Sequence, residues 1–110
     1  AAAQEPVVGT ERLGWEQDAA TLLTAQAYQY AVYVDAGMRT VLTNVTCSGT
    51  TGPFTCIGAM PAMTPGVHSL ALTAAEVIDT VVVESLKSTP LSVRLVVAPA
   101  VPLKARIVRR

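Results

Sequence analysis

Apolar and polar residues alternate along most of this chain, and a period of two predicts strands rather than helices. The clearest example is Tyr28–Asp35, where Tyr30, Val32 and Val34 share one predicted face. A second is Pro61–Ala74, where a Pro-Gly turn leads into an alternating run. Because no stretch keeps a convincing helical period, the pattern predicts an all-β fold.

Turn-forming residues separate the alternating stretches and divide them into about seven strands. The expected strands are Val7–Trp15, Tyr28–Asp35, Arg39–Cys47, Phe54–Met60, Val67–Ala75 and Leu91–Val97. One further apolar stretch, Glu76–Glu84, either extends a hairpin or forms an exposed apolar tip. Short strands at this spacing are typical of a two-sheet antiparallel β-sandwich.

The stretch Glu16–Ala27 does not alternate. It must connect two strands, and we therefore expect a loop here. The alternative is one helical turn that begins at Asp18 as its cap and turns Leu22 and Leu23 inward.

The length of 110 residues fits one domain in which about two-thirds of the unfolded chain's surface can be buried. We place that domain at residues 7–97, after a linker at residues 1–6. Residues 98–110 begin as a Pro-rich linker. They continue with Leu103–Val108, whose alternation predicts an extra strand that pairs with its own sheet or, swapped, with a neighbouring chain.

Hydrophobic residues make up 51% of the sequence but aromatic residues only 5%. The core is therefore expected to be mainly aliphatic, with Trp15 and a few tyrosines as its bulky members. We assign Trp15, Tyr30, Val32 and Leu70 to this core.

The net charge is zero, but the charges are unevenly distributed. Four of the eight basic residues lie after Leu103, so residues 1–103 carry 4 basic and 8 acidic residues, a net charge of −4. Such an acidic body repels phosphate backbones, which excludes nucleic acid as the expected partner. The chain also has no run of about 18 apolar residues, so no membrane insertion is expected.

Cys47 and Cys56 flank a stretch of turn residues that is typical of a hairpin loop. Pairing across the hairpin would form a disulfide, and disulfides persist in oxidising compartments, which predicts an extracellular or periplasmic protein. Two buried free thiols and a metal site are the alternatives, but two sulfurs and one distant histidine are few ligands for a metal. Asn44-Val45-Thr46 matches a glycosylation sequon, which only a eukaryotic secretory pathway can use.

Several short motifs occur in the order found in fibronectin type III domains. They are Leu13-Gly14-Trp15, Tyr30–Val34, Met63–His68 before a strand that ends at Ala74, and Glu84–Val93. From Val7 to Val97 the chain thus resembles a fibronectin type III or immunoglobulin-like β-sandwich module. The resemblance implies that Trp15 packs against Tyr30 in the core.

His68 departs from the pattern of that family. The resemblance places it where the family has a corner tyrosine, whose hydroxyl bonds back to the preceding turn. An imidazole can donate one such bond from a shorter side chain. We therefore expect His68 to be a structural core residue, with a ligand or a catalytic base as the alternative.

The hairpin TCSGTTGPFTC followed by TPGVHSLALTA is also similar to accessory modules of bacterial secreted proteins, which lie next to sugar-dehydrogenase-type propellers that use a quinone cofactor. This resemblance implies an appended sandwich that is not the catalytic part. Its partner would be a neighbouring domain of a longer chain.

Motifs for catalysis are missing from the sequence. His68 is the single histidine, Ser69 points to the opposite face of its strand, and no GxSxG elbow or phosphate-binding glycine loop occurs. We expect no enzymatic activity, catalytic residues, cofactor or metal.

Two classes of function are consistent with this sequence. The first is a non-catalytic accessory or spacer module of a secreted multidomain protein. The second is a protein-interaction module that forms a homodimer or binds a partner through an edge strand or the apolar 77–83 loop. The candidate contact residues of that loop are Val77, Ile78, Val81, Val82 and Val83.

A third hypothesis is a carbohydrate-binding module. Its binding surface would be an aromatic platform formed by Tyr28, Tyr33 and Phe54.

Overall fold

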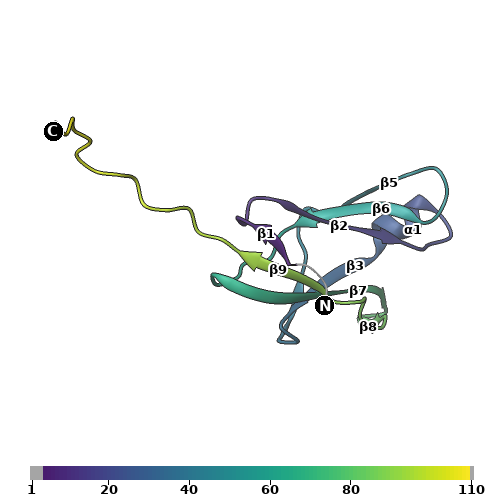
Figure 1. The fold of residues 1–110 in the computed structure, drawn as a ribbon. Helices are drawn as coiled ribbons and strands as arrows, with labels where there is room; N and C mark the ends of the chain where they lie inside the picture. The colour runs from purple at the N-terminus through teal and green to yellow at the C-terminus, as the bar shows by residue number, and fades with distance from the viewer. Residues whose placement is uncertain (1–3, 110) are drawn as a thin grey trace.

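Two β-sheets stack face to face in the computed structural model, which describes residues 4–109 (Figure 1). The elements are β1 (Glu5–Val7), β2 (Arg12–Gln17), α1 (Leu22–Ala27), β3 (Gln29–Val34), β4 (Arg39–Val41), β5 (Thr46–Ser48), β6 (Phe54–Ala59), β7 (Gly66–Ile78), β8 (Val81–Glu84) and β9 (Leu91–Leu95). Strands dominate, which confirms the all-β prediction.

The larger sheet has the strand order β1-β9-β7-β3-β4, and β8 pairs with the far end of β7. The smaller sheet has the order β2-β6-β5. The pair β1 and β9 is parallel, while the other pairs are antiparallel. Strands that follow each other in sequence therefore often lie in different sheets, as in a sandwich.

The first expected strand, Val7–Trp15, is divided between the two sheets. Val7 belongs to β1 in the larger sheet, whereas Trp15 belongs to β2 in the smaller one. Between them Gly9 has a φ of 96°, and the Glu11 carboxylate accepts the amides of Val8 and Gly9. This turn redirects the chain, and an alternating pattern cannot reveal it because both pieces alternate.

The expected linker at residues 1–6 is wrong at its end, because Glu5 and Pro6 belong to β1 and pair with β9. Residues 1–3 lie outside the described part. At the other end of the chain, residues 98–109 leave the sandwich as an extended tail (Figure 1). The extra strand expected at Leu103–Val108 does not form in this single chain, and Arg110 lies outside the described part.

The loop expected between β2 and β3 contains the short helix α1. Thr21 is its N-cap, in place of the Asp18 considered from the sequence, and its hydroxyl accepts the amide of Thr24. Leu22 packs against the core, but Leu23 is 75% exposed. The helix is only six residues long, too short for a helical period to show in the sequence.

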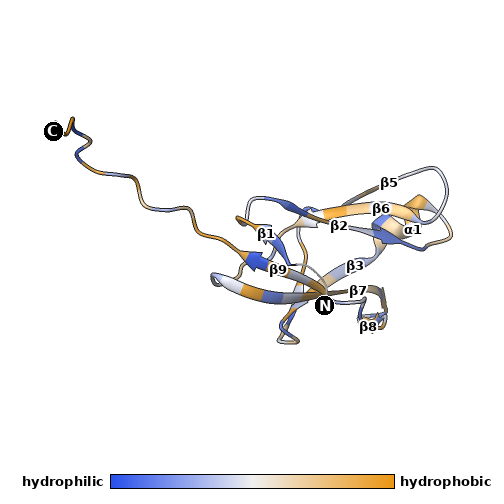
Figure 2. Ribbon diagram, viewed as in Figure 1, coloured by the Kyte–Doolittle hydropathy of each residue, from blue (hydrophilic) through white to orange (hydrophobic). Residues whose placement is uncertain are grey.

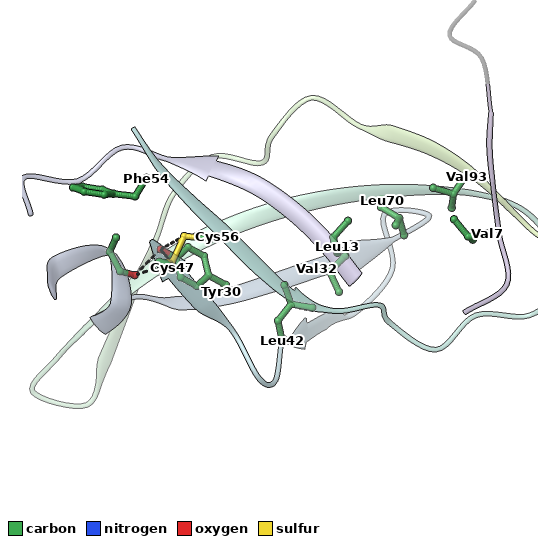
Figure 3. Close-up of a cluster of buried hydrophobic side chains, with 11 residues drawn as sticks. Val7, Leu13, Tyr30, Val32, Leu42, Cys47, Phe54, Cys56, Leu70 and Val93 are labelled. Atoms are coloured by element: carbon green, nitrogen blue, oxygen red, sulfur yellow. Dashed lines mark hydrogen bonds between the residues drawn. A yellow bond between two sulfur atoms is a disulfide. The ribbon is translucent and has the colours of Figure 1, made fainter. Parts of the chain in front are cut away.

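The core lies between the two sheets (Figure 3) and is mostly aliphatic. Its buried members are Val7, Leu13, Ala25, Tyr30, Val32, Leu42, Cys47, Phe54, Cys56, Leu70 and Val93. Trp15 is partly buried and packs against this cluster, with its ring centroid 5.0 Å from that of Tyr30. Gly58 makes room for the indole, because a Cβ there would lie 3.4 Å from Trp15 Cη2.

The Tyr30 phenol joins several parts of the core. Its hydroxyl donates a hydrogen bond of 2.6 Å to the carbonyl of Ala25 in α1 and lies 3.9 Å from the sulfurs of Cys47 and Cys56. Burial is the main cause that raises the pKa of Tyr30 to about 12. Tyr30 therefore stays neutral and connects α1, the disulfide and Trp15.

The stretches Val67–Ala75 and Glu76–Glu84 together form one long hairpin. β7 continues to Ile78, and β8 returns along its last residues. The turn residues Asp79 and Thr80 both have positive φ, which matches the right-handed twist of a two-residue hairpin. After β8, the hydroxyls of Ser85 and Ser88 accept the amides of β7 in place of a continuous strand.

Substitution of Trp15 by alanine tests this packing. We expect a loss of about 3 kcal/mol in the free energy of unfolding, because the change removes a large ring that contacts the core. Leu23→Ala is the matched control, and it should change stability by less than about 0.5 kcal/mol because Leu23 is exposed. Urea unfolding measures both. A loss below about 1 kcal/mol for Trp15→Ala would show that the indole is not part of the core.

Candidate functional site

Cys47 and Cys56 form a disulfide between β5 and β6. The two residues are direct partners in the strand register, and their Cα atoms are 4.0 Å apart. Both are buried, with exposed fractions of 7% and 0%. The pair therefore closes the hairpin loop from inside the core, as the turn residues between the cysteines predict.

His68 is held between two acceptors at one end of the sandwich. Its Nδ1 lies 2.6 Å from Asp35 Oδ2, and its Nε2 lies 2.6 Å from the carbonyl oxygen of Thr64. A carboxylate and a carbonyl can only accept hydrogen bonds, so both ring nitrogens donate and the ring is an imidazolium. The bond to Thr64 is the one that the resemblance implied for an imidazole at this corner.

These contacts change the acidity of both groups. The hydrogen bond to Asp35, followed by that to Thr64, raises the pKa of His68 above its ordinary value. The bond from His68, followed by the amide of Ser69, lowers the pKa of Asp35. The ion pair holds the β3–β4 turn and the loop before β7 together, and with both nitrogens engaged His68 is not placed as a free base. We call it the His68 clamp.

A second polar cluster covers the outer face of the larger sheet. The Glu84 carboxylate accepts hydrogen bonds from Tyr33, Arg39 and Thr73. The Thr73 bond is the first cause, and the Arg39 bond the second, that lower the pKa of Glu84 to about 2. Lys87 Nζ lies 4.3 Å from the centre of the Tyr33 ring. The cluster fastens β8 and the following segment to β3, β4 and β7.

The sequence did not reveal this cluster. Tyr33 and Glu84 are 51 positions apart and meet only because β3 and β8 pair with the same strand, β7. The available signal was the outward position of Tyr33 and Arg39 on neighbouring strands. Without the register it did not indicate Glu84.

The five residues expected to form an apolar contact surface lie together on the β7–β8 hairpin. β3 stops pairing with β7 at Ala75, so the hairpin beyond it extends past the rest of the sheet. The exposed fractions are 53% for Val77, 49% for Ile78, 60% for Val81, 47% for Val82 and 54% for Val83. About half of each side chain is thus open to solvent, and we call this surface the apolar hairpin.

The aromatic platform expected from Tyr28, Tyr33 and Phe54 does not form. Phe54 is 2% exposed, because it faces inward with Cys56 on alternate positions of β6. Tyr28 packs edge-on against Tyr30, at 6.3 Å between centroids. Tyr33 is engaged by Glu84 and Lys87. The three rings therefore offer no shared surface.

Within residues 4–109, no group of three or more His, Cys, Asp or Glu side chains is arranged to hold a metal ion. Nor does this described part contain a helix with the length and apolar character needed to cross a membrane. No known protein family matches the chain, and no curated protein or solved structure matches it. Functional inference therefore depends on the geometry described above.

The His68 clamp predicts a pH dependence of stability. Because the pKa of His68 is raised in the folded state, its contribution is complete below the ordinary value of 6.5 and is lost as pH rises through the raised value. Because the pKa of Asp35 is lowered, its contribution is complete above 3.8 and is lost as pH falls through the lowered value. The clamp is thus strongest between 3.8 and 6.5.

The measurement is urea unfolding of the native chain and of His68→Gln from pH 5 to pH 9. We expect the stability difference between the two proteins to shrink as pH rises above the ordinary histidine range. Asp35→Asn should give a similar loss at pH 6. Curves that stay parallel over the whole range would show that the imidazolium pair contributes nothing.

Proposed function

We propose that this chain is a non-catalytic accessory or spacer module of a secreted multidomain protein. The observation that carries the proposal is the direction of its outer strands. β1 and β9 are parallel neighbours, with Glu5 beside Val93 and Val7 beside Leu95. The chain therefore enters at one end of the larger sheet and leaves at the other, which suits a module that separates two neighbours.

The strand order supports the fibronectin type III or immunoglobulin-like assignment. The order β2-β6-β5 corresponds to strands B-E-D of such sandwiches, and β9-β7-β3 corresponds to G-F-C. His68 near the start of β7 bonds back to Thr64, as a corner residue of that family would. Modules of this kind commonly occur as units of longer chains.

The disulfide supports a secreted location. Glutathione and thioredoxin keep most cytosolic thiols reduced, whereas cystines persist outside the cell or in the periplasm. The Cys47–Cys56 bond lies in the core beside Tyr30, where it serves stability rather than exchange. We therefore propose an extracellular or periplasmic protein.

A fusion experiment tests the spacer role. The whole chain is placed between two fluorescent reporter domains, and single-molecule energy transfer measures the distribution of distances between them. We expect one narrow distribution, because the sandwich fixes the separation of its entry and exit points. The control is a Gly-Ser linker of equal length, which gives a broad distribution around about 55–60 Å. A distribution as broad as that of the control would contradict the proposal.

The second candidate is a protein-interaction module that self-associates or binds a partner. Two surfaces favour it: the apolar hairpin, with its half-exposed valines, and the free edge of a strand in the smaller sheet. We expect sedimentation velocity to show a concentration-dependent dimer of the isolated chain. A single monomeric species at millimolar concentration would remove self-association.

A further inference from the structure

The free edge of β2 is the longest edge in the molecule. β2 pairs with β6 on one side, and no strand of the described residues occupies its other side. It spans six residues, whereas the other edge strands β1, β4 and β5 span three each and β8 four. β1 also carries Pro6, which cannot donate to a further strand. β2 therefore offers the most complete template for an added strand.

An apolar cleft of about 630 Å³ runs beside this edge. Leu13 and Trp15 of the smaller sheet line it together with Leu70, Leu72 and Leu91 of the larger sheet. The indole nitrogen of Trp15 is buried and has no hydrogen-bond partner. The sandwich is therefore open on the β2 side, where a further strand would cover the leucines.

The tail of this chain has the features of such a strand. Leu103, Ala105 and Ile107 alternate with Lys104 and Arg106. Leu103 is 82% exposed and Ile107 78% exposed, and Figure 2 shows apolar segments along the length of the tail. The tail holds four basic residues, whereas residues 1–103 carry 4 basic and 8 acidic residues, a net charge of −4. Tail and body are thus complementary in both charge and apolar surface.

We propose that the tail of a second copy of this chain pairs antiparallel with β2 and covers the cleft. One register places Ile107 beside Leu13, the small Ala105 beside the Trp15 indole, and Leu103 beside Gln17. The alternate tail residues then lie on the outer face, where Lys104 is beside Glu16. A shift of one residue would turn the apolar set outward, so this parity is the one that buries it.

The direction of the strands explains why a second copy provides the tail. Leu95 lies beside Val7, so β9 ends at the end of the sandwich where the chain turns into β2 at Arg12. To run antiparallel to its own β2, the tail would first have to return along the sandwich to Gln17. In the structure it instead leads away from the body (Figure 1). Two copies that exchange tails form a closed dimer with twofold symmetry.

This inference rests on the second candidate function, self-association, and specifies its site. The test uses sedimentation velocity of the full chain at several concentrations. Ala105→Pro removes a ladder donor at the centre of the tail strand and should weaken the dimer roughly tenfold or more. Ala100→Pro, in the Pro-rich linker, is the matched control and should leave it unchanged. Val82→Asp tests the apolar hairpin and should also leave it unchanged.

A charge exchange tests the register. Glu16→Lys and Lys104→Glu should each weaken the dimer, and the double variant should restore it. Trp15 is the only tryptophan, so its fluorescence reports on the cleft and should shift to shorter wavelength as the dimer forms. Higher salt should weaken the association.

The remaining outcomes separate the proposals. A dimer that Val82→Asp abolishes and Ala105→Pro leaves intact keeps self-association but overturns the tail site. A strict monomer whose Trp15 emission responds to Ala105→Pro places the tail on its own β2 and overturns the second copy. A strict monomer with no such response overturns both, while the spacer role is decided by the reporter distances.

Discussion

The packing of Trp15 against Tyr30 is the contact on which the two sheets depend. Trp15 comes from the smaller sheet and Tyr30 from the larger one, and their rings are 5.0 Å apart. The same phenol holds α1 through Ala25 and lies against the disulfide. With so few aromatic side chains in the sequence, this one pair supplies much of the bulk that fills the space between the layers.

An aliphatic core leaves the margins of the sandwich to polar contacts. The His68 clamp secures one end, and the Glu84 carboxylate secures β8 to the outer face of the larger sheet. Both sites take their partners from segments that are distant in sequence. Their charges are engaged with each other, which explains why titratable groups that resemble catalytic pairs serve to hold loops and strands.

The functional proposals follow from how the strands end. Parallel β1 and β9 give the chain an entrance and an exit at opposite ends, while the overhang of β7 and β8 and the unpaired side of β2 leave apolar surface open. A spacer and a self-associating module share this architecture. Contacts through β2 or the apolar hairpin would leave the entrance and exit free, so the two roles are compatible.

The sequence by itself determined the all-β class, most strand positions and the cysteine pairing, because alternation and turn residues act between near neighbours. It also indicated that Tyr30 and Val32 face inward and that the valines of the 77–83 loop form an apolar tip. Only the tertiary structure decided that Val7 and Trp15 belong to different sheets, that Phe54 is buried, that α1 forms, and that Glu84 meets Tyr33 and Arg39. These features depend on sheet assignment and register, which are set by contacts between distant segments and leave no local signature.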